Sequence, residues 1–270
     1  MRLISMKKYT LLIPAILLIL ALTPALSQKL QTTQWQITSP KLKEAARFAV
    51  LSDLHNSFFG KNQEELAGAI CDAAPDAVLM VGDMAENPKT MDGVQTLIRS
   101  LKGGFPIYYV SGNHECADAD ALNNIKQMLR QMGVNVLEGK RAFLREDLYI
   151  SGADDPLCCT KEEWLRQIDA CRTEDEGFTL LLSHRPDRIA AYSRGFDLTI
   201  CGHAHGGQIR FGNHGLIAPN QGLFPKYTSG FYEAGEGKMF VSRGLAKGIL
   251  PRFLNRPELA IIDILPESDF

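Results

Sequence analysis

Histidine, aspartate and asparagine residues recur directly after short apolar runs, and these side chains are the ones best suited to chemistry in this sequence. They occur in five places, namely Asp53-Leu54-His55, Gly82-Asp83, Gly112-Asn113-His114-Glu115, His184 and Gly202-His203-Ala204-His205. Carboxylate oxygens, an amide carbonyl and imidazole nitrogens are donors that divalent transition metals accept, and this set is too large for one ion. The pattern therefore predicts a hydrolase that uses two metal ions.

Each of the five places follows a segment that we expect to be a strand covered on both faces, because its hydrophobicity is continuous. The apolar runs are residues 47–52, 77–81, 107–111, 178–183 and 198–201. Two repeats at helical spacing lie between them, Leu66-Ala69-Ile70-Ala73 and Leu122-Ile125-Leu129-Met132. Since open α/β sheets collect functional groups at the carboxyl ends of their strands, the five places should meet at one sheet edge.

The 270 residues have an ordinary globular composition, with 45% hydrophobic and 22% charged side chains. The formal net charge of −2 gives no overall basic field, so no nucleic-acid partner is indicated. No linker or repeat interrupts the alternation of strand and helix patterns after Arg47. We therefore predict one α/β domain over residues 46–266, preceded by a polar stalk over residues 28–45.

The N-terminus carries a targeting signal. Arg2, Lys7 and Lys8 precede residues 9–28, which contain no charged side chain. Ala25-Leu26-Ser27 offers small residues where a signal peptidase reads them, and the stretch also approaches the ~20 residues that span a bilayer. Residues 1–27 are thus predicted to be a cleaved signal peptide or a retained membrane anchor. In both cases the positive-inside rule places the rest of the chain outside the cytoplasm.

Six cysteines in an exported chain raise the question of disulfides. Cys71 lies on the apolar side of a predicted helix and Cys201 ends a predicted strand, so we expect both to be core thiols. Three others are close enough in sequence to form one bridge, although their spacing matches no zinc motif: Cys158, Cys159 and Cys171. Cys116, beside the Gly-Asn-His turn, is expected to be a partly buried loop thiol, with a position close to the metals as the alternative.

The ordered motifs resemble those of the calcineurin-like metallophosphoesterases over residues 46 to 265. Five motifs in the same order, each closing a strand, make the resemblance specific. Further matches resemble a membrane-associated bacterial branch related to UDP-diacylglucosamine pyrophosphatases: His203-Ala204-His205-Gly206-Gly207-Gln208, Ser242-Arg243-Gly244 and Arg256-Pro257-Glu258. The resemblance implies a four-layer α/β/β/α sandwich of two mixed β-sheets, with a dinuclear metal site at the carboxyl ends of the strands.

The resemblance also implies which side chains hold the two ions. One ion would be bound by Asp53, His55, Asp83 and His205. The other would be bound by Asp83, Asn113, His184 and His203. Asp83 suits the bridging position because a carboxylate offers two oxygens, whereas a neutral imidazole offers one lone pair. Two ions ~4 Å apart activate a water and clamp the phosphoryl oxygens, and Mn, Fe and Zn all fit these ligands.

His114 follows the predicted ligand Asn113 but is not a ligand in the family pattern. We expect it to protonate the leaving oxygen or to stabilise the phosphoryl charge, a role worth roughly 10² to 10⁴ in rate. Glu115 either orients this imidazole or is an exposed acid that reduces repulsion near the metals. His214, in the glycine-rich loop 211–215, is expected to be a hydrogen-bonded structural residue.

Arg185 and Arg243 are candidate substrate contacts, with an exposed solubilising arginine as the alternative for each. The stretch from Leu245 to Arg256 mixes apolar and basic residues, which suits an anionic membrane surface, although an ordinary surface loop is the alternative. The predicted substrate is a phosphorylated small molecule or a lipid-linked envelope compound with a phosphodiester or pyrophosphate bond. A broad phosphomonoesterase is one alternative. A metal-binding scaffold without catalysis is another, but it predicts gaps in the ligand series, which is complete.

Overall fold

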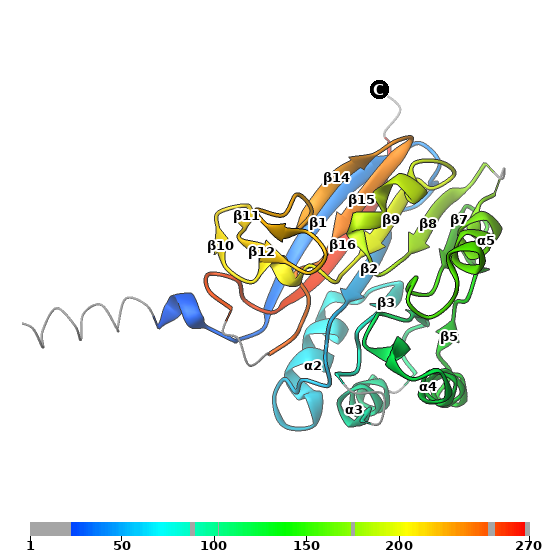
Figure 1. Ribbon diagram of the computed structural model, residues 1–270. Coiled ribbons are helices and arrows are strands. Elements are labelled where there is room, and N and C mark those ends of the chain that lie inside the picture. Colours follow the sequence, from blue (N-terminus) through cyan, green and yellow to red (C-terminus); the bar gives the residue numbers. More distant parts are fainter. Residues whose placement is uncertain (1–22, 87–89, 102, 174–175, 248–251, 268–270) are drawn as a thin grey trace, which may run out of the picture.

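Two six-stranded β-sheets lie face to face in the structure, with helices on both outer faces (Figure 1). This computed structural model describes residues 23–86, 90–101, 103–173, 176–247 and 252–267. The predicted four-layer α/β/β/α sandwich of two mixed sheets is confirmed.

The sheets have the following strand orders. The first is β1 (Gln31–Ser39), β16 (Glu258–Pro266), β2 (Ala46–Leu51), β3 (Ala77–Val81), β4 (Ile107–Val110) and β5 (Asn135–Val136). The second is β14 (Gly230–Ala234), β15 (Gly237–Val241), β9 (Leu198–Cys201), β8 (Phe178–Leu182), β7 (Leu148–Gly152) and β6 (Lys140–Arg145). Strands β2 to β5 run parallel, as do β15, β9, β8 and β7. The carboxyl ends of the site-bearing strands within each sheet therefore share one edge.

Three layers of apolar side chains hold the elements together. Helices α2 (Glu64–Ala73), α3 (Asp92–Ser100) and α4 (Ala119–Gln131) cover the outer face of the first sheet. Helix α5 (Lys161–Cys171) and the 3-10 helix η5 (Pro186–Tyr192) cover the second. The continuously apolar strands fill the layer between the sheets, where residues such as Phe48, Leu180 and Phe240 are fully buried. The two predicted helical repeats correspond to α2 and α4.

The predicted polar stalk is wrong, because residues 31–39 form strand β1, which pairs in parallel with β16. Burial alternates along β1, with odd-numbered positions turned toward the sheet interior and even-numbered positions exposed. Only Trp35 and Ile37 are large apolar residues on the inward face, so the period-two signal of a half-exposed edge strand was weak. Trp35 packs edge-on against Phe231 and Phe240 of the other sheet.

Two short hairpins lie between β9 and β14, and we call residues 208–226 the hairpin loop. It contains β10 (Arg210–Phe211) paired with β11 (His214–Gly215), and β12 (Ile217–Ala218) paired with β13 (Gly222–Leu223). The remaining 3-10 helices are η2 (Pro24–Leu26), η3 (Lys61–Gln63), η4 (Glu115–Ala117) and η6 (His205–Gly207). In Figure 1 the hairpin loop lies on the side of the molecule where η2 begins the described chain.

Most of the predicted signal or anchor segment, residues 1–22, lies outside the described residues. Within the ranges given above, no helix has the length and apolar character needed to cross a bilayer. The end of the segment is placed: Ala25 is buried, and its carbonyl accepts a hydrogen bond from the Leu254 N–H at 2.6 Å.

Candidate metal centre

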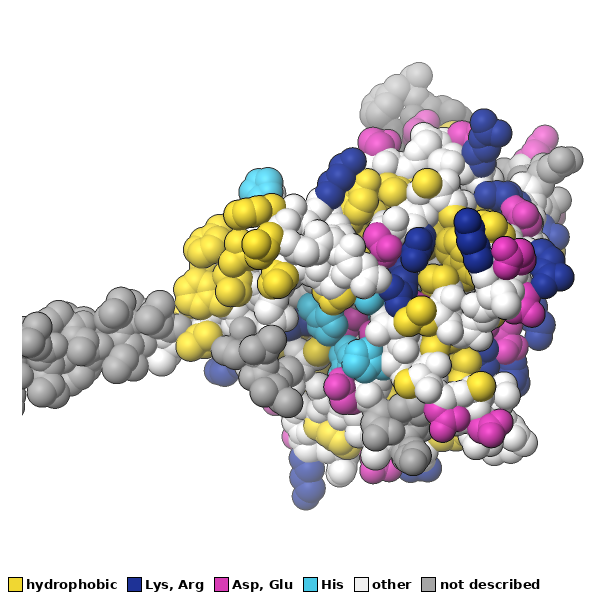
Figure 2. Space-filling model, in the orientation of Figure 1, with side chains coloured by type: hydrophobic (Ala, Val, Ile, Leu, Met, Phe, Trp, Pro, Cys, Tyr) yellow, Lys and Arg dark blue, Asp and Glu magenta, His cyan; other side chains and the backbone are white. Residues whose placement is uncertain are grey.

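The structure brings the seven predicted ligands together where five strands end. They follow β2, β3, β4, β8 and β9 by two to four residues and are Asp53, His55, Asp83, Asn113, His184, His203 and His205. Two groups made only of predicted ligands have donor atoms within 4.8 Å of one another: Asp53 with His55 and His205, and Asp83 with His184 and His203. The first group contains three of the four residues predicted for one ion, and the second contains three of the four predicted for the other. Figure 2 shows histidine side chains reaching the surface at this place.

Asp83 lies between the two groups. Its Oδ2 is 3.2 Å from Nε2 of His184 in one group and 3.8 Å from Nε2 of His55 in the other. Its Oδ1 accepts the His114 N–H at 2.8 Å, which fixes the carboxylate orientation. This geometry fits a carboxylate that is shared by two cations.

Three of the donor atoms have no hydrogen-bond partner among the described residues, as expected of atoms that bind a metal. Asn113 Oδ1, His184 Nε2 and His203 Nε2 are buried and accept no hydrogen bond from the described protein. Buried polar atoms are rarely left unpaired, since each costs about 1–3 kcal/mol. His184 Nδ1 lies 2.9 Å from the Val81 carbonyl, so Nδ1 carries a proton and Nε2 is the ring nitrogen that is left to bind a metal. The residues present therefore fit two divalent ions.

Unusual backbone conformations aim these side chains. Five residues of the set have positive φ between 45° and 66°: Asp53, His55, Asp83, His203 and His205. Non-glycine residues avoid this region, and such strain concentrates at functional sites. Gly112 lets two ligand loops approach, since a Cβ there would lie 2.2 Å from Asp83 Oδ1. A Cβ on Gly82 would lie 2.6 Å from Nδ1 of His184.

Burial and mutual charge shift the titration of the four ligand histidines. Burial lowers the pKa of His203 to about 2, helped by the charges of His184 and Arg185. Burial and Arg252 lower the pKa of His205 to about 4, and burial lowers that of His55. For His184 burial also lowers the pKa, but Asp83 and Asp53 outweigh it and raise the value to about 10. Three imidazoles are thus held neutral for metal binding, while the fourth must lose a proton to bind.

Glu115 is completely buried and binds backbone rather than the His114 ring. Its carboxylate accepts N–H groups from Asp83 at 3.0 Å, Ala85 at 2.9 Å and Gly112 at 2.8 Å. The expectations of an imidazole-orienting or exposed acid are therefore wrong. Burial and Asp83 raise the pKa of Glu115 to about 7, although the backbone donors oppose that shift. The side chain joins the loop after β3 to the loop after β4.

His114 lies at the rim of the centre, half-buried, with its ring edge-on to His55 at 4.6 Å between centroids. Its Nδ1 is 3.3 Å from the Glu86 carbonyl, which leaves Nε2 for a substrate. The Glu86 carboxylate lies 2.5 Å from His55 Nδ1 and forms a third group with His55 and His114. Sequence reasoning missed Glu86, whose only signal is its position three residues after Asp83.

Both candidate substrate arginines are engaged in ion pairs. Arg185 is 4% exposed and its Nε lies 2.7 Å from Asp155. Arg243 Nη2 lies 3.1 Å from Glu258 and 3.3 Å from Gln31 Oε1. Within the stretch 245–256, Arg252 is buried rather than on the surface, and residues 248–251 lie outside the described residues. The Arg252 guanidinium donates to the Arg243 carbonyl at 2.8 Å.

The disulfide prediction is wrong in its partners, because Cys116 pairs with Cys158. Cys159 and Cys171 are free thiols, and Cys71 is exposed on α2 rather than in the core. Cys201 is buried as expected. Sequence distance misled the prediction, since the fold brings the loop after β4 next to the loop after β7, where Ser111 Oγ hydrogen-bonds Asp154 at 2.7 Å.

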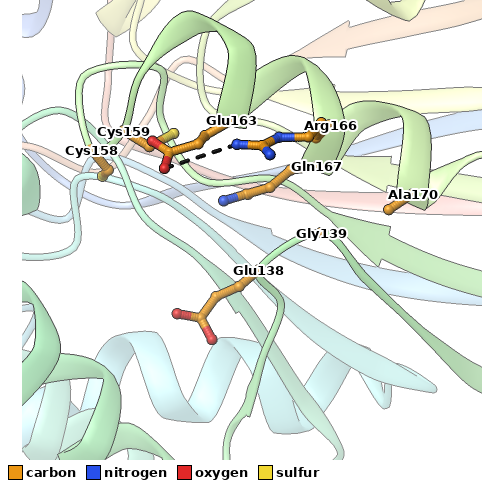
Figure 3. A pocket seen from close by; sticks show the side chains of 8 residues that line it. All are labelled: Glu138, Gly139, Cys158, Cys159, Glu163, Arg166, Gln167 and Ala170. Carbon is orange, nitrogen blue, oxygen red and sulfur yellow. Dashed lines mark ion pairs between the residues drawn. The ribbon is translucent and has the colours of Figure 1, made fainter.

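Cys158 and Cys159 also line an open hollow of ≈ 520 Å³ beside α5, together with Glu138, Glu163 and Arg166 (Figure 3). None of the seven predicted ligands lines this hollow, so it is separate from the metal centre.

The chain is similar to known proteins in sequence and in fold. The calcineurin-like phosphoesterase family profile matches residues 46–207. An uncharacterised metallophosphoesterase of Bacillus subtilis, YkuE, is 28% identical over 250 residues, covering 87% of this chain and 85% of that protein. Escherichia coli phosphodiesterase YaeI is 25% identical over 232 residues, covering 82% and 83% respectively. The crystal structure of Thermus thermophilus TT1561 shares the fold, with a TM-score of 0.51 at 11% identity, over 76% of this chain and 92% of that one.

A family match over more than half of the chain coincides with a set of convergent, unpaired metal donors. The protein is therefore a hydrolase that works with two divalent metal ions, and it belongs to the calcineurin-like phosphoesterases.

Proposed function

We propose that this phosphoesterase acts outside the cytoplasm, close to the membrane, on the phosphodiester or pyrophosphate bond of a lipid-linked or envelope-derived substrate. The observation that carries the reaction type is the cluster of seven donor side chains with Asp83 between its two halves. The similarity to YaeI, a phosphodiesterase of Escherichia coli, favours a diester.

Different side chains of the centre would have different roles in the reaction. Two divalent ions held by the seven donor side chains would supply an activated water and charge to hold the phosphoryl oxygens. His114 Nε2 faces away from the Glu86 carbonyl that holds Nδ1, so it is placed to give a proton to the leaving oxygen. Glu115 keeps the Asp83 and Gly112 backbone fixed while charge moves across the centre. As Asp83, Asn113 and His114 sit on loops that Glu115 joins, their relative positions are set before substrate binds.

Two features support the location. Basic residues precede the uncharged stretch 9–28, which favours transfer of the following chain across the membrane. The Cys116–Cys158 disulfide suits an oxidising compartment, since disulfides are rare in reducing cytosol. Strand β1 begins at Gln31, so at most a few residues separate the domain from the end of the apolar stretch. An anchor that is retained would hold the centre near lipid headgroups.

Protease accessibility in spheroplasts tests the location. A domain outside the cytoplasm is digested in intact spheroplasts, while one that is protected until lysis contradicts the proposed topology. For the substrate, rates should be compared on phosphodiester, pyrophosphate and monoester compounds, each presented in vesicles and free in solution, with Mn²⁺ supplied. We expect faster turnover of vesicle-borne diesters or pyrophosphates. Equal rates in the two forms would leave a general exported phosphoesterase, and a preference for monoesters would favour the phosphomonoesterase alternative.

A further inference from the structure

Large apolar side chains gather at the surface of the hairpin loop and the two segments beside it. We call them the hairpin patch; its members and their exposed fractions are Phe224 79%, Leu223 66%, Phe211 62%, Leu254 51%, Ile217 46% and Leu26 42%. Figure 2 shows this gathering (yellow) next to the histidines of the metal centre (cyan). Single exposed leucines are common on soluble proteins, whereas clusters of this kind mark interaction surfaces.

Hydrogen bonds and ring contacts bind the patch into one surface. Ile217 and Leu223 are direct partners across the β12–β13 hairpin. Phe211 packs on Phe253 with 6.2 Å between ring centroids, and Phe253 precedes Leu254 in the chain. Leu254 in turn binds the Ala25 carbonyl, next to Leu26. The side chains of the patch therefore form one continuous, connected surface and are not isolated residues at separate loop tips.

The segments that supply the patch contain basic residues but no acidic ones. No aspartate or glutamate occurs in residues 1–43, 202–232 or 237–257, the three segments that supply the patch. A hollow of ≈ 360 Å³ at the base of the hairpin loop is lined by Lys226, His214 and Arg210 without any carboxylate. Segments that combine exposed apolar side chains with cations and contain no carboxylate suit an anionic lipid headgroup layer.

The position of the patch in the chain indicates that its partner is a membrane. Its member Leu26 lies within the last residues of the uncharged stretch 9–28, whose preceding part is outside the described structure. A stretch of this length and composition enters a bilayer, at least transiently. If this stretch enters the membrane, as the proposed function requires, the point where the chain joins the folded domain lies at the patch.

The hairpin loop is also fixed to the metal centre. Arg210 Nη1 donates to the Gly206 carbonyl at 2.8 Å, and Asn255 Nδ2 donates to the His205 carbonyl at 2.7 Å. The Leu216 N–H binds the Gly207 carbonyl at 3.0 Å. A partner that binds the patch therefore also fixes the position of the loop that carries His203 and His205.

We propose that the hairpin patch inserts its side chains into the outer part of an anionic phospholipid bilayer and so sets the metal centre at headgroup level. This inference rests on the proposed membrane-proximal function and adds the surface that meets the lipid. It replaces the sequence-based expectation for residues 245–256, of which Leu254 joins the patch whereas Leu245 and Arg252 are buried.

Quenching by brominated lipid tests the insertion in the full chain. Phe224→Trp adds an indole to the patch, and Phe143→Trp is the matched control, since Phe143 is 68% exposed on β6 outside the patch. Each variant is reconstituted in phosphatidylcholine and phosphatidylglycerol vesicles with and without brominated acyl chains. The emission of native Trp35 and Trp164, measured in the unmodified chain, is subtracted. We expect loss of most of the added Phe224→Trp emission and little loss for Phe143→Trp.

Three results would overturn the insertion. Equal weak quenching of both variants would mean that the patch stays in water. Absence of quenching together with a dimer that Leu223→Ser/Phe224→Ser dissociates would make the patch a contact between copies. A blue-shifted Phe224→Trp emission without vesicles, unaffected by bromine, would mean that the chain itself covers the patch. Hydrolysis of bis(4-nitrophenyl) phosphate in the same samples tests the phosphoesterase function separately, because quenching needs no turnover.

Discussion

Removal of the Glu115 carboxylate should destabilise the protein severely although Glu115 is not a predicted ligand. Glu115→Ala leaves three buried backbone donors without an acceptor, those of Asp83, Ala85 and Gly112. Each orphaned donor costs about 1–3 kcal/mol, or roughly 3–9 kcal/mol together, against total stabilities of about 5–15 kcal/mol. Because water can enter the space left behind, we expect the lower part of this range.

Glu115→Gln should cost less. Oε2 accepts from both Asp83 and Gly112, so a glutamine oxygen in that place keeps two bonds while its NH₂ group faces the Ala85 N–H. We therefore expect a loss of about 1–3 kcal/mol, the cost of one unpaired donor. Turnover should fall in both variants, more in Glu115→Ala, because the Asp83 and Asn113 loops lose their common anchor.

The assay is denaturant unfolding of the metal-free protein, so that metal binding does not contribute to the free energy of unfolding. Glu65→Ala, an exposed glutamate on α2, is the control and should change stability by no more than about 0.5 kcal/mol. Unfolding of Glu115→Ala at the same denaturant concentration as the wild type would refute the hydrogen-bond account.

Three further outcomes follow from the centre and its surroundings. His114→Ala should keep both metals and lose roughly 10² in rate on alkyl esters but less on aryl esters, whose leaving oxygen needs little protonation; equal losses would exclude a general acid. Cys116→Ala removes the disulfide to Cys158 and should lower the free energy of unfolding by ~4 kcal/mol, as expected for two cysteines 42 residues apart. Cys71→Ala, which removes a free thiol, is the control, and an equal loss of stability in both variants would contradict a stabilising role of the disulfide. Asp83 and Asp53 raise the His184 pKa, so this group's contribution to metal-free stability is present below about pH 6.5 and is lost as pH rises through about 10. A metal ion must displace the His184 proton, so calorimetry should show proton release and a metal affinity that rises up to ~10-fold per pH unit. A metal affinity that does not change with pH would contradict a protonated His184.

The metal loops could be predicted from sequence because each follows a continuous apolar run. Strands β3 and β9 have the predicted bounds, and the predicted strand 107–111 ends one residue early at Val110. A buried strand needs a hydrophobic side chain at nearly every position, which leaves a strong signal. The residues just beyond such strands fall at one edge whatever the details of the helices.

The missed features depend on contacts between distant segments. Strand β1 owes its place to pairing with β16, more than 200 residues later, and its own half-exposed pattern is polar. The Cys116–Cys158 pair and the burial of Glu115 likewise depend on how neighbouring loops pack after the sheets form. The hairpin loop has two-residue strands that leave no periodic signal.

Asp83 is expected to join the two metal ions in one centre. Asp83→Asn keeps the shape of the side chain, and its amide oxygen can still accept the His114 N–H, so the fold should persist. A neutral amide cannot balance two cations as a carboxylate does. Elemental analysis beside turnover should give two metals per wild-type chain, and fewer than two in Asp83→Asn with turnover lowered by several orders of magnitude. Two metals and wild-type turnover in Asp83→Asn would contradict the account.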